Sequence, residues 1–138
     1  MILDNDIQGL REAKYLYEHR QYMDKDVLYN AVVSLNEYQL FTVGQLSQLS
    51  GLSDSTIAGW GIKMPRKGGG KFNPQSLDTL IQLRLNLNNG RPLNAVLLAS
   101  AVQDGNSHRI ISRLTGVGLS RISKVISKHA TDSGTDLQ

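Results

Sequence analysis

The chain has 138 residues, no cysteine and a formal net charge of +3, and 40% of its residues are hydrophobic. A chain of this size and composition folds as one compact domain or two very small ones, too small for most enzyme folds that need a large sheet or barrel. The absence of cysteine excludes disulfides and thiolate metal sites, and no apolar run approaches the roughly 20 residues that span a bilayer, so we expect a cytoplasmic protein without a membrane segment.

The first 41 residues predict two amphipathic helices and hold seven acids against four bases, a net charge of −3. Apolar positions recur at helical spacing from residue 4 to residue 22, on a face formed by Ile7, Leu10, Tyr17 and the methylene stem of Lys14. They recur again from residue 24 to about residue 38, on a face formed by Val27, Ala31, Leu35 and Tyr38, beside Leu28 and Val32. We interpret residues 1–23 as an acidic N-terminal helix.

Residues 24–72 are interpreted as the first of two similar helical units. Two short helices are expected at 42–50 and 53–61, separated by Gly51, which we expect to adopt the positive φ of a turn. Pro65 and three consecutive glycines at 68–70 exclude a regular helix over 62–72, where a short β-hairpin is expected instead. This segment contains no acid and four bases, which are Lys63, Arg66, Lys67 and Lys71.

The segment 73–91 predicts a long central helix that joins the two units. Asn73 is a favourable N-cap and Pro74 suits the first helical turn. The helix is apolar almost all round, which predicts a central position; its apolar residues are Leu77, Leu80, Ile81, Leu83, Leu85 and Leu87.

Residues 92–130 form the second predicted unit. A helix opened by Pro92 is expected to run to about Gln103, and two short helices are expected at 107–115 and 119–130. Residues 106–130 contain no acid and five bases, which are Arg109, Arg113, Arg121, Lys124 and Lys128. The polar tail 131–138 is expected to fray. The predicted fold class is therefore all-α, with two helical units, a central connecting helix and a short hairpin at 62–72.

An internal repeat relates the two units. Residues 30–33 (Asn-Ala-Val-Val) resemble residues 94–97 (Asn-Ala-Val-Leu) at an offset of 64, and residues 45–52 resemble residues 110–117 at an offset of 65. Further along, Ser55, Ile57 and Trp60 match Ser120, Ile122 and Val125. Because these blocks occur in the same order at a nearly constant offset, we interpret them as a structural duplication.

The repeated core has the pattern of a helix-turn-helix. A small residue (Ser47, Ser112) lies where the two helices would cross closely, and a glycine follows four positions later (Gly51, Gly116). Apolar residues flank each turn, which leaves the N-terminal part of the second helix free to enter a major groove. Over 43–61 and 108–126 the chain resembles the helix-turn-helix repressors and regulators of phages and bacteria.

This resemblance implies a set of DNA-contacting residues in each unit. In the first unit they would be Ser53 as the N-cap, with Asp54, Ser55, Thr56 and Gly59. In the second unit they would be Leu119, Ser120, Arg121, Ser123 and Lys124, supported by the other cations Arg109, Arg113 and Lys128. Arg121 is the best candidate for a bidentate contact to guanine.

Residues 62–72 resemble the wing of winged helices in mercury-resistance-regulator-type proteins and small phage excisionases. The resemblance rests on the basic, glycine-rich stretch followed by Phe72-Asn73-Pro74 and a leucine-rich helix. The chain departs from those families because their aromatic pair and their effector or dimer helix are absent. The resemblance implies that Lys63, Arg66, Lys67 and Lys71 supply the phosphate attraction of the first unit, whose recognition helix has Asp54 and neither Lys nor Arg.

Other kinds of site find little support in the sequence. The histidines at 19, 108 and 129 do not cluster with acids at ligand spacing, no serine has an evident base, and Gly68-Gly69-Gly70-Lys71 lacks the spacing of a P-loop. We therefore expect no metal, no cofactor and no catalytic activity. The five tyrosines, all between residues 15 and 38, are expected to pack in the core or between subunits, and Trp60 is expected to cover the core of the first unit.

Three functions remain open at this point. The first is a sequence-specific transcriptional regulator, a phage-type repressor that reads a bipartite, asymmetric site in double-stranded DNA on the nucleoid of a bacterial or phage-infected cell. The second is a DNA-binding accessory protein of recombination, transposition or packaging, similar to an excisionase or a small terminase subunit. The third is an adaptor in which the acidic residues 1–41 bind a protein partner or a second copy.

Overall fold

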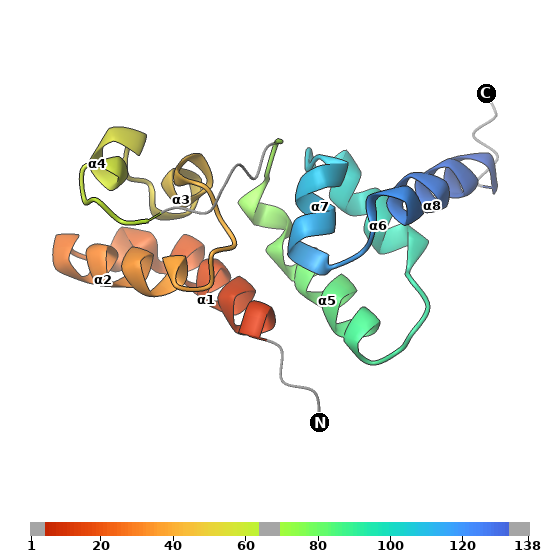
Figure 1. The fold of residues 1–138 in the computed structure, drawn as a ribbon, viewed down its shortest axis with the longest axis horizontal. Coiled ribbons are helices and arrows are strands. Elements are labelled where there is room, and N and C mark those ends of the chain that lie inside the picture. The colour runs from red at the N-terminus through yellow and green to blue at the C-terminus, as the bar shows by residue number, and fades with distance from the viewer. Residues whose placement is uncertain (1–4, 64–69, 133–138) are drawn as a thin grey trace. The chain divides into compact units, whose positions relative to one another are not determined.

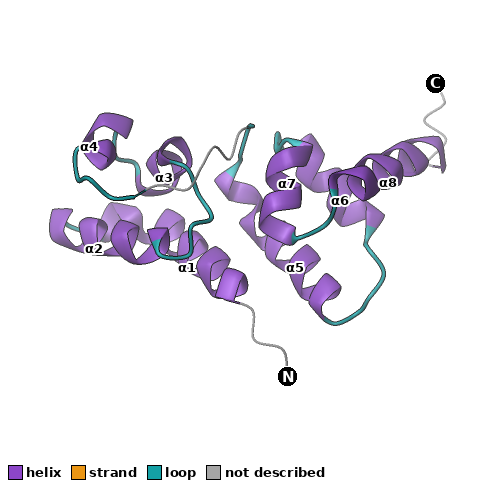
Figure 2. Cartoon of the chain, in the orientation of Figure 1, coloured by secondary structure: helices purple, strands orange, loops and turns teal. Residues whose placement is uncertain are grey.

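The computed structural model describes residues 5–63 and 70–132, with side chains up to residue 130; this part of the chain contains helices and no strand (Figure 2). The all-α class predicted from the sequence is confirmed. The chain divides into two compact units, Met1–Gly68 and Gly69–Gln138. Among the helices described, none combines the length and the apolarity needed to cross a membrane.

The first unit contains four α-helices, which are α1 (Asn5–His19), α2 (Lys25–Asn36), α3 (Val43–Ser50) and α4 (Asp54–Ala58), with the 3₁₀ turn η1 (Arg20–Tyr22) after α1. Helix α1 packs against α2 and α3, and α4 packs against α3 (Figure 1). Helix α2 begins where the Asp24 side chain accepts a hydrogen bond from the Val27 N–H at 2.9 Å, and Thr42 forms a capping box with Gln45 at the start of α3. Local capping chemistry therefore sets both helix starts.

The core of the first unit draws on all four helices; its buried apolar residues include Leu10, Ala13, Leu16, Val32, Leu35, Leu46, Leu49 and Ile57. The faces predicted for the first two helices are partly wrong. Val27 is exposed, whereas Val32 and Leu35 are buried and Lys14, expected on the face through its methylene stem, is half-buried with an ion pair to Glu18 at 3.2 Å. The physical reason is that α1 packs against both α2 and α3, which extends the buried stripe of α1 onto Ala13 and Leu16 and centres that of α2 on Val32 and Leu35.

The second unit contains the 3₁₀ turn η2 (Pro74–Ser76), α5 (Leu77–Asn88), α6 (Ala95–Gln103), α7 (His108–Thr115) and α8 (Leu119–Asp132). Helix α5 packs against α6 and α7, and α8 packs against the same two helices (Figure 1). Asn73 is an N-cap, as predicted, but the turn that it caps is 3₁₀. Helix α6 begins later than predicted, because the Asn94 side chain accepts hydrogen bonds from the N–H groups of Val96 and Leu97.

The segment 73–91, predicted as a connector, contains α5, which is twelve residues long. Leu77, Leu80 and Leu83 are buried, and the helix packs against its neighbours α6 and α7. The apolar character that predicted a central position for this helix thus corresponds to a place in the core of the second unit.

The predicted hairpin at 62–72 falls largely on residues 64–69, which lie outside the described residues. On either side, residues 62–63 and 70–72 are not in a strand. The Lys63 carbonyl accepts hydrogen bonds from the side chains of Asn36 at 2.7 Å and Gln39 at 3.1 Å, and the Lys71 carbonyl accepts one from the Ser107 N–H at 2.9 Å. Each end of the basic segment is therefore held by its own unit, and the hairpin itself stays a prediction.

Candidate nucleic-acid interface

The helices before each turn begin and end in the same way at an offset of 65 residues. Thr42 and Ser107 both accept a hydrogen bond from the backbone N–H three residues later, which caps α3 and α7. Gly51 and Gly116 end these helices with φ values of 81° and 85°, as predicted for the turn. Only glycine adopts this left-handed conformation without strain.

The turns themselves are also alike. The Ser50 hydroxyl accepts a hydrogen bond from the Leu52 N–H at 3.2 Å, and the Thr115 hydroxyl accepts one from the Val117 N–H at 3.3 Å. Buried residues recur at the same offset, which pairs Leu46 with Ile111, Leu49 with Leu114 and Ile57 with Ile122. The block of the sequence repeat at 45–52 and 110–117 therefore has equivalent structural roles in the two units.

In each unit an arginine donates a hydrogen bond to a backbone carbonyl at the end of the helix before the turn. The sequence did not predict this feature. The Arg20 guanidinium donates to the Gln48 carbonyl at 2.6 Å, and that of Arg84 donates to the Leu114 carbonyl at 3.0 Å. Both carbonyls lie in the last helical turn, where the helix has no N–H of its own to offer and a cation is favoured. Arg20 and Arg84 are 64 residues apart and lie in different kinds of element, the 3₁₀ turn η1 and helix α5, so the repeat alone does not reveal the pair.

The first block of the predicted repeat is out of register. Val32 is fully buried, whereas its predicted counterpart Val96 is 66% exposed. Burial instead pairs Val32 with Leu98, and Leu35 with Ala101, at an offset of 66. The error arises because both blocks are short continuous apolar runs, in which neighbouring residues point to different faces of the helix, so residue identity alone does not show which of them is buried.

Most of the predicted DNA-contacting residues are exposed. In the first unit these are Ser53, Asp54, Ser55, Thr56, Gly59 and Lys63, whereas Arg66 and Lys67 lie outside the described residues. In the second unit the exposed members are Lys71, Arg109, Leu119, Ser120, Arg121, Ser123, Lys124 and Lys128, and Arg113 is half-buried. Ser53 is the N-cap of α4, as predicted, and accepts a hydrogen bond from the Thr56 N–H at 3.1 Å.

The cations of the second unit concentrate on α7 and α8. Arg121, Lys124 and Lys128 follow one another at spacings of three and four residues, which places them on one face of α8. Arg109 and Arg113, four residues apart, share a face of α7. Residues 105–131 contain five bases and no acid, which gives this stretch of the sequence a net charge of +5.

Four of these five cations have an uncharged residue at the equivalent position of the first unit, whereas Lys128 matches Lys63. At the offset of 65, the residues that match Arg109, Arg113, Arg121 and Lys124 are Gly44, Gln48, Thr56 and Gly59. Helix α4 is also shorter, with five residues against fourteen in α8. The two predicted recognition helices therefore differ in both length and charge.

The aromatic residues of the first unit are placed differently from the prediction. Tyr15 and Tyr22 are 60% and 80% exposed and Tyr29 is also exposed, so packing in the core is wrong for these three. Trp60 is half-buried, and its ring meets that of Tyr29 edge-on with centroids 4.8 Å apart. Among the described residues, no three His, Asp or Glu side chains are grouped in a way that could hold a metal ion.

Comparison of the chain with protein families, with curated proteins and with solved structures finds no match in any of the three.

Proposed function

We propose that the chain is a sequence-specific double-stranded DNA-binding regulator of the phage-repressor type, in which α3–α4 and α7–α8 act as two helix-turn-helix units. The observation that carries this proposal is the repeated turn, with left-handed Gly51 and Gly116 in the same place after a capped helix. In each unit a helix with an exposed N-terminal turn follows. A helix presented in this way fits a major groove.

The second unit supplies the stronger of the two predicted contacts. Helix α8 has fourteen residues and is therefore about 21 Å long, enough to lie along a major groove. Arg121 is in its first turn, where a recognition helix meets base edges, and guanine is the base that an arginine fork matches. Lys124 and Lys128, farther along the same face, are suited to phosphates.

The first unit offers different chemistry. The hydroxyls of Ser53, Ser55 and Thr56 lie within hydrogen-bond distance of one another at the start of α4, with Ser53 Oγ at 3.2 Å from Ser55 Oγ and 2.8 Å from Thr56 Oγ1. Asp54 can accept from cytosine N4 but repels phosphate. The phosphate contacts of the first unit would come from Lys63, Arg66 and Lys67, whereas Lys71 belongs to the second unit. Two helix-turn-helix units with different contact residues on one chain imply that a monomer binds an asymmetric site made of two different halves.

The test of DNA binding is the affinity for a duplex measured at several salt concentrations. If six to eight cations contact phosphates, the slope of log K against log salt is about −5 to −7. Lys124→Ala should make this slope shallower by about 1. Arg91→Ala is the matched control, because Arg91 is an exposed cation of the same unit outside the proposed interface. A change in affinity of less than about tenfold between 50 and 200 mM salt would contradict the proposal.

A second candidate is a DNA-binding accessory protein of recombination, transposition or packaging, which would use the same two helix pairs. A regulator acts alone at a promoter, whereas an accessory protein needs a catalytic partner. Repression of a reporter that carries the bound site, by this chain alone, favours the regulator. If no duplex is bound even at low salt, the adaptor reading replaces both.

A further inference from the structure

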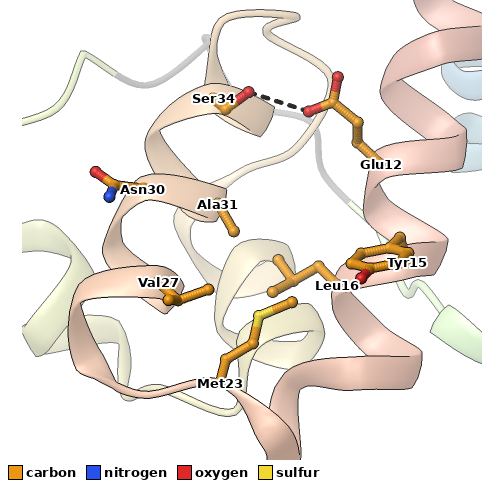
Figure 3. Close-up of a pocket in the computed structure, with 8 residues that line it drawn as sticks. All are labelled: Glu12, Tyr15, Leu16, Met23, Val27, Asn30, Ala31 and Ser34. Atoms are coloured by element: carbon orange, nitrogen blue, oxygen red, sulfur yellow. Dashed lines mark hydrogen bonds between the residues drawn. The ribbon is translucent and has the colours of Figure 1, made fainter.

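The first unit has an open, mainly apolar groove between α1 and α2, with a volume of about 390 Å³. Leu16, Met23 and Val27 point toward one another at one end of it (Figure 3). At the other end the Ser34 hydroxyl donates to the Glu12 carboxylate at 3.1 Å. No part of the described chain fills this groove.

Two large exposed side chains, Tyr15 and Val27, line the groove. Tyr15, Tyr22, Val27 and Tyr29 all belong to the α1–α2 region and are exposed, whereas the described part of the second unit exposes only Val96 and Leu119 among its large hydrophobic residues. Exposed aromatic residues are enriched at protein interfaces, where they supply much of the binding energy.

One ring of the groove is already held in place. The Tyr15 ring stacks on His19 with centroids 4.1 Å apart. A ring that is ordered before binding loses less conformational entropy when a partner covers it. The α1 side of the groove is therefore pre-organised.

The shape of the groove favours a helix as its occupant. On α2 the groove is lined by Val27, Ala31 and Ser34, which are four and three residues apart. On α1 it is lined by Glu12, Tyr15 and Leu16, which share one face of that helix. Two helices that present such parallel rows form the kind of groove that receives the apolar face of a third helix.

The two helices that form the groove carry a net negative charge. Glu12 is the one acid among the residues that line the groove, which include neither Lys nor Arg, and its second oxygen accepts from the Tyr38 hydroxyl at 2.6 Å. Residues 5–38 hold six acids against four bases. Lys14 and Glu18 pair with each other, which leaves five acids and three bases outside that pair. An occupant with basic side chains beside its apolar face would complement this charge.

We propose that the α1–α2 groove binds an amphipathic helix of another protein, one with large apolar side chains on one face and Lys or Arg beside them. The apolar side chains would displace water from Met23 and Val27, and the basic side chains would meet Glu12. This is a protein-binding site that uses neither α4 nor α8, so it does not depend on the proposed DNA interface.

The test uses a labelled synthetic helix of about 15 residues, with Leu and Phe at i, i+4 and i+7 and Lys beside them. Its binding to the full chain is measured by fluorescence anisotropy, next to a peptide in which Glu replaces every Lys. We expect the Lys peptide to bind at least about tenfold more tightly than the Glu peptide. Val27→Asp should weaken the Lys peptide at least about tenfold, because it places a charge on the apolar floor.

Val96→Asp is the matched control, since Val96 is an exposed valine near the start of α6, as Val27 is near the start of α2. Tyr15→Ala provides a second groove variant if Val27→Asp lowers the melting temperature. Failure of both peptides to bind, equal binding of both, or equal loss in Val96→Asp would each overturn the proposal. A concentration-dependent dimer in sedimentation that Val27→Asp dissociates would also overturn it, because a second copy would then be the occupant.

Discussion

Gly51 and Gly116 are the residues whose identity the turns constrain most. Their φ values of 81° and 85° lie in the left-handed region, which costs a residue with a Cβ roughly 1–2 kcal/mol. A Cβ added at either position would meet its neighbours at ordinary contact distances, the nearest being Arg20 Cδ at 3.7 Å and Leu87 Cδ2 at 3.5 Å. The penalty for a side chain is therefore backbone strain and not a clash.

We expect Gly51→Ala and Gly116→Ala each to lower the free energy of unfolding of their own unit by about 1 kcal/mol. Urea titration followed by circular dichroism measures the change. Gly118→Ala is the control, because a Cβ there would enter open space and its φ is not positive. An equal loss at Gly118 would mean that the turn conformation is not the cause.

Tyr38 links stability to alkaline pH. Its hydroxyl donates to the Glu12 carboxylate at 2.6 Å, and this hydrogen bond, with burial and the negative charges of Glu12 and Glu37, raises the pKa of Tyr38 above its usual 10.0. A raised pKa means that the protonated phenol stabilises the folded state. The contribution is complete below the unfolded pKa and is lost as the pH rises through the folded pKa.

Tyr38→Phe should therefore lower stability at pH 7 and make stability less sensitive to pH above about 10. Urea titrations of the two proteins at neutral and alkaline pH measure both effects. An identical alkaline decline in wild type and variant would show that the Tyr38–Glu12 hydrogen bond does not contribute.

At the scale of elements, the two units contain buried asparagines with unequal hydrogen bonding. Asn106 Oδ1 accepts from the Asn73 N–H at 2.8 Å, and its Nδ2 donates to the Ser76 hydroxyl at 2.7 Å and to the Ala101 carbonyl at 2.9 Å. These bonds join the turn before α7 to the start of η2. Asn36 donates to the Lys63 carbonyl, but its Oδ1 has no partner within the described part of the chain.

Asn106→Ala should lower the free energy of unfolding by about 1–3 kcal/mol, because it leaves the buried partners of Asn106 unsatisfied. Asn36→Ala should have a smaller effect, since the Lys63 carbonyl keeps the Gln39 side chain as a donor. Thermal unfolding of the two variants measures the difference. If Asn36→Ala lowers the free energy of unfolding as much as Asn106→Ala does, or more, this ranking is wrong.

The elements that could be predicted are those decided by local chemistry. Ser53 and Asn73 have side chains that cap the following turn, and Gly51 has the conformation that ends α3, so these boundaries can be read from residue types. The buried face of α2 could not be predicted, because it depends on how α1 and α3 pack against that helix. This is why Val27, expected on a core face, instead lines an open groove.

At the scale of the whole molecule, the two units have diverged in charge. Residues 1–68 hold eight acids and seven bases, a net charge of −1, and residues 69–138 hold eight bases and four acids, a net charge of +4. The second unit carries its cations on α7 and α8, whereas the first exposes tyrosines beside an apolar groove. A shared helical plan thus supports two different surfaces.

The central claim is that two unlike helix-turn-helix units read one asymmetric site, and selection of bound sequences from a random duplex pool tests it most directly. We expect the wild type to enrich a site with two different halves. Arg121→Ala should relax the sequence of one half and leave the other intact, because Arg121 belongs to α8 alone. Enrichment of a palindrome, or an equal loss of specificity in both halves with Arg121→Ala, would contradict the account.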